Sequence, residues 1–202
     1  MTTIAEMPAG FADKVLSAQS TFRSVMDAMA RPGSVQRIEA ASGVPSPMMR
    51  GSAAIALTLF DQDTPVWLDA AMAATPNVAK WIKFHTSAPV IAGSSVCSFA
   101  LIADARALPD FEEFSFGTGE YPDRSTTIIL QVGSLTEGPA YELRGPGIDG
   151  VAILRASIDL PDLLDRLSLN AKLFPRGIDL VLVADDAVVA IPRTTRLTAK
   201  EG

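Results

Sequence analysis

The sequence is poor in the residues that bind metals and form cross-links. Its 202 residues include one cysteine, Cys97, and one histidine, His85. A disulfide needs a pair of cysteines and a zinc site needs several Cys or His ligands, so one chain has the residues for neither. Cys97 lies in an apolar run at residues 96–103. We expect it to be a small buried side chain in a reducing compartment.

Long apolar segments and excess positive charge are also missing. The longest stretch without Asp, Glu, Lys or Arg covers residues 84–103, and it contains Pro89, Gly93 and five Ser or Thr residues. A membrane helix of about 20 residues rarely has that composition. The N-terminus lacks the basic start and apolar segment of a secretory signal. The net charge of −6 disfavours nucleic acid and anionic membranes. We expect a soluble, cytoplasmic protein with neither as a partner.

The motifs that most directly identify catalysts are absent too. The sequence has no P-loop, no GxGxxG fingerprint and no GxSxG nucleophile elbow. These absences argue against a P-loop nucleotide site, a dinucleotide site and a serine-hydrolase triad.

The apolar pattern predicts helices interleaved with strands. Residues 11–29 form the clearest helix, which the Arg31-Pro32-Gly33 segment should end. Its predicted apolar stripe is Phe11, Val15, Ala18, Phe22, Val25 and Met29, at spacings of three and four. Further helices are predicted at residues 47–60, 75–84 and 161–174, and a short helix running into a loop within 111–121.

Strands are predicted where short β-branched or apolar runs occur. The predicted strands are residues 34–39, 65–69, 90–91, 99–103, 126–132, 140–144, 151–154, 178–184 and 187–191. The 126–132 run is apolar enough to be a central strand, and we expect 140–144 to pair beside it. Asp185 and Asp186 favour a hairpin between the last two strands. These elements predict a single domain over residues 1–202, an α/β three-layer αβα sandwich with a mixed sheet.

Four residues are the first candidates for binding an anion or ligand, and each has a structural alternative. His85 has a reference pKa near neutrality and suits acid–base chemistry, although a lone histidine is usually structural. Arg193 follows the last predicted strand, where it can reach a crevice beside the sheet or pair with a carboxylate. Arg23 and Arg31 lie on or just after the first helix and can equally form surface or interface ion pairs.

Three further residues are secondary candidates, and no residue can be named as catalytic. Arg144 opens the segment 144–148 (RGPGI), which is either a small anion-binding nest or, more simply, a tight turn. Asp179 starts a strand, where a carboxylate more often orders a loop than performs chemistry. Thr194 follows Arg193. No metal site is expected.

An ordered set of short strings resembles the PhnH family of bacterial phosphonate metabolism. The strings are Gln19, Phe22-Arg23, Ala28-Met29, Pro32-Gly33, residues 64–68 (TPVWL), 84–86 (FHT), Gly117-Thr118, 127–135 (TIILQVGSL), Gly147-Ile148, 174–182 (FPRGIDLVL) and 191–195 (IPRTT). They span almost the whole chain. The charged loop at residues 119–125 departs from the family pattern, so no role carries over to it.

The resemblance implies a fold like the large domain of pyridoxal-phosphate (PLP)-dependent transferases, without the cofactor, and a homodimer when isolated. None of the five lysines lies at a convincing sheet edge for a Schiff base, in agreement with a chain that binds no PLP. The implied function is that of a carbon–phosphorus lyase subunit. It would act with the G, I and L partners to replace the adenine of ATP by an alkyl phosphonate at the ribose, and J and K are further expected partners.

Three hypotheses about the chain's own role stay open. It supplies a docking surface with a cationic edge at Arg23, His85 and Arg193, or it is a pure scaffold that buries its first two helices against a partner, or it is an independent small-molecule enzyme. Changing each of the three residues to Ala should abolish growth on phosphonate without unfolding the protein. The scaffold hypothesis predicts that the isolated chain binds neither ATP nor phosphonate.

Overall fold

The computed structural model describes residues 10–200. The α-helices are α1 Lys14–Ala30, α2 Arg50–Leu59, α3 Ala70–Ala73, α4 Pro76–Thr86 and α5 Leu163–Ala171. Four short 3-10 helices are η1 Ser94–Val96, η2 Ala105–Ala107, η3 Phe111–Glu113 and η4 Pro122–Arg124. No helix in the described part is both long and apolar enough to cross a membrane.

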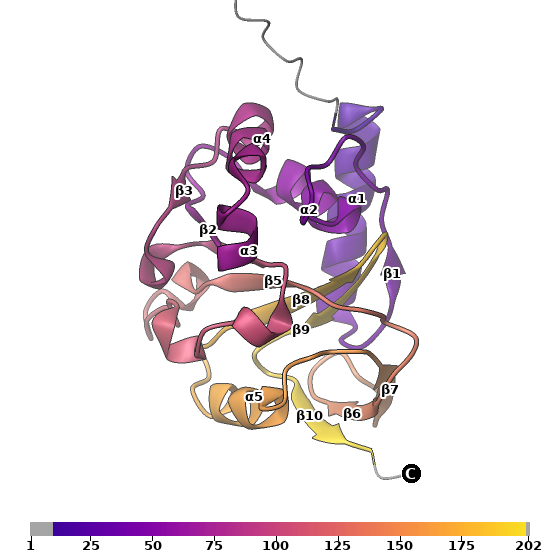
Figure 1. Ribbon diagram of the computed structural model, residues 1–202. Helices are drawn as coiled ribbons and strands as arrows, with labels where there is room; N and C mark the ends of the chain where they lie inside the picture. The colour runs from indigo at the N-terminus through magenta and orange to yellow at the C-terminus, as the bar shows by residue number, and fades with distance from the viewer. Residues whose placement is uncertain (1–9, 201–202) are drawn as a thin grey trace, which may run out of the picture.

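A seven-stranded mixed sheet runs through the middle of the molecule (Figure 1). Its strands are β1 Gln36–Arg37, β2 Val66–Leu68, β3 Val90–Ile91, β4 Phe99–Ile102, β5 Thr127–Gln131, β8 Asp179–Ala184 and β9 Ala187–Ile191. Their order is β1-β9-β8-β5-β4-β2-β3. The strands from β3 to β8 in that order pair in parallel, whereas β9 is antiparallel to both β8 and β1. A separate antiparallel sheet contains β6 Ala140–Arg144, β7 Ala152–Arg155 and β10 Arg196–Ala199, in the order β10-β6-β7.

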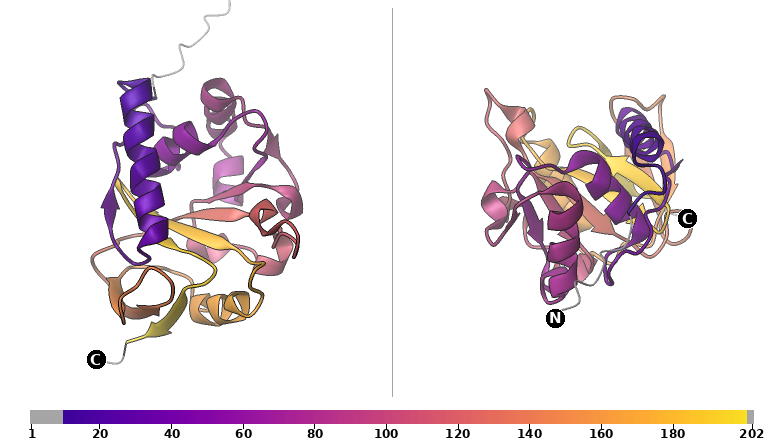
Figure 2. Two further views of the ribbon diagram at one scale, coloured as in Figure 1. Left: turned by 180° about the vertical axis from the view of Figure 1, so that it is seen from behind. Right: turned by 90° about the horizontal axis from the view of Figure 1, so that it is seen from above.

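Alternate residues of the central strands point into two apolar cores, because successive side chains of a strand face opposite sides of a sheet. Leu101, Ile129 and Val181 pack with α1, α2 and α4 on one face. Ile102, Ile128 and Leu180 pack on the other face with α5 and the small sheet. Figures 1 and 2 show these two layers above and below the sheet. Near-complete burial explains why β5, β8 and β9 are almost continuously apolar.

The prediction of an α/β fold with a mixed sheet is confirmed, but the third layer is only partly helical. One α-helix, short 3-10 helices and the three-stranded sheet cover the second face. The predicted pairing of residues 140–144 with 126–132 is wrong. β4 and β8 occupy both edges of β5, so β6 pairs with β7 and β10 instead.

The buried side of α1 contains only part of the predicted apolar stripe. Asp13 begins the helix by accepting hydrogen bonds from the amides of Val15 and Leu16 at 3.0 and 2.9 Å. The buried residues of this helix are Ser17, Thr21, Val25 and Ala28. Val15 and Phe22 are instead 64% and 48% exposed. Small residues let α1 approach α2 closely, so the larger apolar side chains are left outside.

Several other predicted elements are confirmed with shifted ends. α2 begins at Arg50 rather than near Pro47, and α5 is shorter than the predicted 161–174 helix. The β8–β9 hairpin is present, and Asp185 has a left-handed φ of 50° in its turn. The short helix α3 and strand β10 were not predicted.

Candidate functional site

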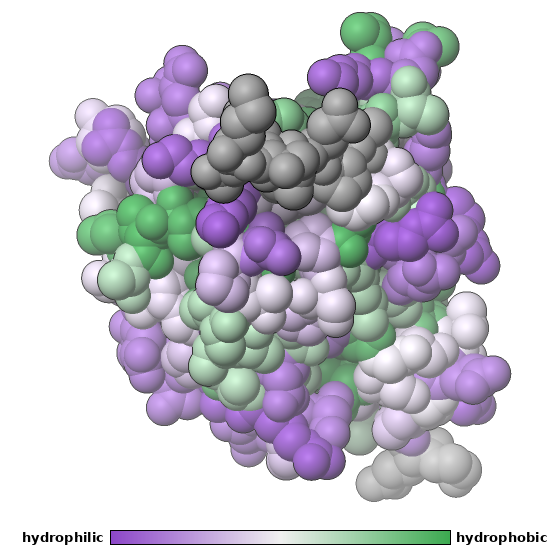
Figure 3. Space-filling model, turned by 45° about the horizontal axis from the view of Figure 1, so that its top comes forward, coloured by the Kyte–Doolittle hydropathy of each residue, from purple (hydrophilic) through white to green (hydrophobic). Residues whose placement is uncertain are grey.

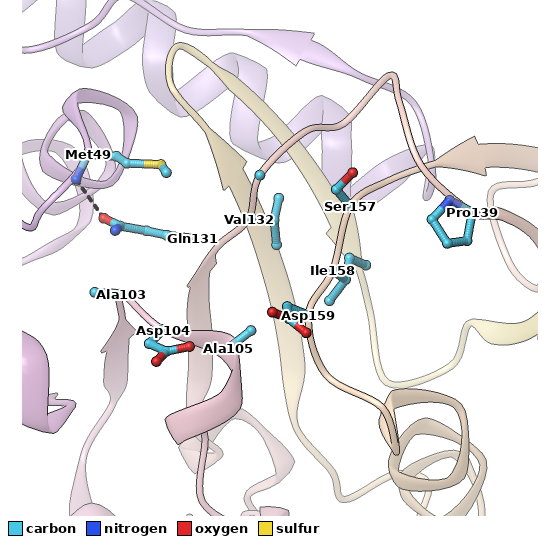
Figure 4. Close-up of a pocket in the computed structure, with 11 residues that line it drawn as sticks. Met49, Ala103, Asp104, Ala105, Gln131, Val132, Pro139, Ser157, Ile158 and Asp159 are labelled. Atoms are coloured by element: carbon cyan, nitrogen blue, oxygen red, sulfur yellow. Dashed lines mark hydrogen bonds between the residues drawn. The ribbon is translucent and has the colours of Figure 1, made fainter.

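A pocket, which we call the carboxyl-edge pocket, lies beyond the carboxyl ends of β4 and β5. Its volume is about 590 Å³, within the usual range for small-molecule sites. Residues 103–105 and 131–133 form two walls, and residues 157–159 with Met49 and Pro139 form the others. Figure 4 shows side chains from these segments surrounding one opening. In open α/β sheets, ligands bind at this edge.

A buried carboxylate fixes one wall of the pocket. Asp69 directly follows β2 and is fully buried. Its Oδ2 accepts hydrogen bonds from the amides of Ala103 at 2.8 Å and Asp104 at 3.1 Å, and its Oδ1 accepts one from the amide of Met72 at 2.9 Å. Asp69 therefore holds the loop after β4 against the start of α3.

An amide fixes a second wall. Gln131, the last residue of β5, accepts a hydrogen bond from the Met49 amide at 2.6 Å and donates one to the Pro47 carbonyl at 3.0 Å. The amide of Gly133 donates to the Ser157 carbonyl at 3.1 Å. These contacts tie three separate segments together, so the pocket walls are preorganised.

The pocket is acidic. Asp104 and Asp159 line it, and none of its described lining residues is Lys or Arg. Arg106 lies beside it but pairs with Asp159 at 2.6 Å. No group of three or more metal-ligating side chains occurs among residues 10–200.

Arg193 and Asp179 form a second polar centre, at the amino end of β8. Asp179 Oδ1 accepts hydrogen bonds from the amide and the Nε of Arg193, at 2.7 and 3.1 Å. The remaining guanidinium N–H groups donate to Asp179 Oδ2, Ser125 Oγ and the carbonyls of Pro122 and Pro175. All five N–H groups of Arg193 are thus used internally. Both side chains are 13% exposed.

The family described as "Bacterial phosphonate metabolism protein (PhnH)" matches residues 9–198. The chain belongs to the PhnH family. A curated PhnH relative from Rhizobium meliloti (strain 1021), named alpha-D-ribose 1-methylphosphonate 5-triphosphate synthase subunit PhnH, is 48% identical over 200 residues and covers 98% of each chain. A putative C-P lyase subunit protein HtxG from Stutzerimonas stutzeri is 30% identical over 203 residues, covering 98% of this chain and 96% of that protein.

The PhnH resemblance rested partly on IPRTT and FPRGIDLVL, and the structure brings these two strings together. Arg193 comes from the first string and Asp179 from the second, and their pair holds Pro122 and Ser125 of the charged 119–125 loop. The arrangement supports the loop-ordering alternative for Asp179. It leaves Arg193 no N–H group for an external anion.

Arg23 and His85 lie on the helical face. Arg23 lines a groove of about 290 Å³ with Ala18, Gln19, Phe22 and Thr58. It has no ion pair or hydrogen bond within residues 10–200. His85 stacks on Trp81, with 4.4 Å between ring centroids, and meets Phe84 edge-on. Neither Arg23 nor His85 lines the carboxyl-edge pocket.

Arg31 and Arg144 lie apart from both polar centres. Arg31 pairs with Asp27 at 2.9 Å on the exposed end of α1. Arg144 is exposed and has only a 3.9 Å contact with Glu142. Gly147 packs so closely on the Ala30 carbonyl that a Cβ would lie 2.1 Å from that oxygen. The segment is therefore a tight turn packed on a carbonyl oxygen, and its role as an anion-binding nest stays a prediction.

Sequence reasoning missed the pocket residues. Asp69 has a local signal, since an Asp between a strand and a helix often caps that helix. Gln131 stands out as an amide at the end of an apolar run. Asp104 and Asp159 have no comparable signal, because only the fold brings residues so far apart in sequence to one pocket.

Proposed function

We propose that this chain is a subunit of the carbon–phosphorus lyase machinery for organic phosphonate catabolism. Its role is to work with the G, I and L partners in transferring the ribose triphosphate moiety of ATP to an alkyl phosphonate, with loss of adenine. The observation that carries this proposal is similarity over 98% of the chain to a relative named as a subunit of a ribose 1-methylphosphonate 5-triphosphate synthase. The second relative is also named as a C-P lyase subunit.

The exposed side of α1 supports a role in assembly. Val15, Phe22 and Met26 lie seven and four residues apart, so they share one side of the helix. They are 64%, 48% and 50% exposed, although the opposite side of α1 is packed. Exposed apolar side chains that share one surface mark sites of protein association. We expect another subunit, from among G, I, J, K and L, to cover this stripe, and a second copy to cover it in the isolated homodimer.

A second apolar area lies at the other edge of the sheet. Val90 of β3 and Val96 of η1 are exposed, and β3 is an edge strand. Figure 3 shows apolar residues gathered at the left of the molecule, the side on which β3 lies in Figure 1. This edge is a further area for subunit contact, since an edge strand has unpaired backbone groups.

The geometry supports Arg23 and the carboxyl-edge pocket as the candidates for a direct part in chemistry. Arg23 lies beside the exposed apolar side chains of α1. It is exposed and has no ion-pair or hydrogen-bond partner within residues 10–200. The alternative proposal is a scaffold with no ligand site of its own.

The PLP-transferase likeness and the absence of that cofactor remain proposals. All five lysines are exposed, and none lines the carboxyl-edge pocket, where a buried Schiff-base lysine would be expected. The sheet order with one antiparallel strand within a parallel series is the feature to compare with such enzymes. The buried single thiol of Cys97 supports a cytoplasmic location.

Growth on a phosphonate as the sole phosphorus source tests this function. Deleting the gene should abolish growth on methylphosphonate but not on phosphate, and a plasmid copy should restore it. Arg23→Ala should impair growth with the protein still folded, whereas Arg144→Ala, at another exposed arginine, should not. Normal growth of the deletion strain on methylphosphonate would contradict the proposal. Normal growth of Arg23→Ala would favour the scaffold alternative.

A further inference from the structure

The carboxyl-edge pocket is negatively charged, and this charge determines which part of a phosphorylated ligand it can bind. Asp104 and Asp159 both line it, and the neighbouring groove contains Asp185 and Asp186. Two arginines close to these carboxylates, Arg37 and Arg106, pair with Asp186 and Asp159 respectively. Each of these two cations is thus neutralised by one carboxylate, and Asp104 and Asp185 have no ion pair within residues 10–200.

A phosphate or phosphonate group is a poor occupant of this pocket. Charges of like sign repel one another. No described lining residue is a cation that could offset the repulsion. The charged ends of a ribose phosphonate triphosphate are therefore disfavoured here.

A hydroxyl-bearing neutral group suits the same residues. Ionised carboxylates only accept hydrogen bonds, and a carboxylate that binds ribose hydroxyls is a recurring feature at the carboxyl edge of parallel sheets. Asp104 Oδ1 accepts one bond from the Arg106 amide, at 3.0 Å. Its Oδ2 has no partner within the described part of the chain and is available to a ligand hydroxyl.

The wall that carries Asp104 is held in place before any ligand arrives. The buried Asp69 carboxylate accepts a hydrogen bond from the Asp104 amide at 3.1 Å, and Gln131 fixes a second wall by accepting one from the Met49 amide. A rigid acceptor loses little conformational entropy on binding. The pocket thus combines suitable size, fixed walls and acceptor chemistry.

We propose that this pocket binds the ribosyl part of a nucleoside, with Asp104 and Asp159 accepting its hydroxyls and the polyphosphate directed out to solvent. The inference rests on the proposed function, because the ribose comes from the reaction in which the relative is named. Beyond the proposed function, the inference gives this subunit a ligand site and a role separate from that of the other subunits. This subunit holds the uncharged part of the nucleotide, and the cations for its phosphates come from elsewhere in the assembly.

Calorimetric titration with adenosine, on both the purified chain and the assembly that co-purifies with it, tests the proposal. Adenosine should bind, 2′-deoxyadenosine should bind more weakly, and neither tripolyphosphate nor methylphosphonate should displace adenosine. Asp104→Asn and Asp159→Asn should each weaken adenosine binding roughly tenfold, as expected for loss of a hydrogen bond to a charged acceptor. Asp165→Asn, on α5 and outside this pocket, is the matched control and should leave the Kd unchanged.

Three results would overturn the inference: no adenosine binding by either sample, an unchanged Kd in both pocket variants, or displacement of adenosine by tripolyphosphate. A second measurement distinguishes failure of this inference from failure of the proposed function. If the Asp104→Asn, Asp159→Asn double variant still co-purifies with the other subunits, the chain is a subunit whether or not it binds a nucleoside. Loss of every partner from the wild-type chain would instead count against the function.

Discussion

Arg193 shows how a residue with the chemistry of an anion site can be fully occupied within the fold. Its guanidinium joins Asp179 to Ser125 and to the carbonyls of Pro122 and Pro175. Three segments distant in sequence, residues 122–125, residues 175–179 and Arg193 itself, thus meet at one side chain. Its effect on function is therefore expected to come through the 119–125 loop and the start of β8.

Replacing Arg193 by Ala should lower the free energy of unfolding by about 3–5 kcal/mol, because it leaves the Asp179 carboxylate buried without its partner. Arg144→Ala is the control, since that side chain is exposed and its contact with Glu142 is long; it should change stability by less than about 0.5 kcal/mol. Urea unfolding of both variants measures the difference. Equal stabilities would show that the Arg193 network contributes nothing.

Cys97 gives a prediction about pH. Burial raises the pKa of its thiol above the ordinary value, because the thiolate loses solvation. The unfolded chain has the ordinary pKa, so the folded state loses relative stability as pH rises through that value toward the folded one. At a pH below the raised pKa, the thiol of the folded protein stays protonated. It should then react with a thiol reagent at least about tenfold more slowly than the thiol of the chain unfolded in urea. Equal rates at pH 8 would contradict the described burial.

At the scale of elements, the strands were easier to predict than their partners. Apolar runs identified β5, β8 and β9 because burial on both faces leaves a continuous pattern. The pairing of β6 could not be read from its sequence, since it depends on β4 and β8 already occupying the edges of β5. The pocket was missed for the same reason: Asp104 and Asp159 meet only through the fold.

Helix α1 provides a direct check on which face is buried. Val25 is 5% exposed and Val15 is 64% exposed. Val25→Ala should therefore cost about 1–3 kcal/mol of stability through lost burial and a residual cavity, whereas Val15→Ala should change it by less than about 0.5 kcal/mol. Denaturant unfolding at low protein concentration compares the two. A similar loss of stability in both variants would restore the stripe predicted from sequence, which contains both valines.

At the scale of the whole molecule, the exposed stripe on α1 and the acidic pocket lie on a chain that lacks the usual equipment of an independent catalyst. No metal cluster was found within residues 10–200, and the sequence has no phosphate-binding loop and no nucleophile elbow. We propose that the chain requires partners, because both relatives reported above are named as subunits.

Purification of the tagged chain from phosphate-starved cells tests this requirement most directly. The wild-type chain should bring other carbon–phosphorus lyase subunits with it. Phe22→Glu combined with Met26→Glu should lose them, because charge on the α1 stripe opposes apolar burial. Leu169→Glu, at an exposed apolar residue of α5, should retain them. A wild-type chain that brings no partner, yet converts substrate alone at an enzymatic rate, would contradict the account.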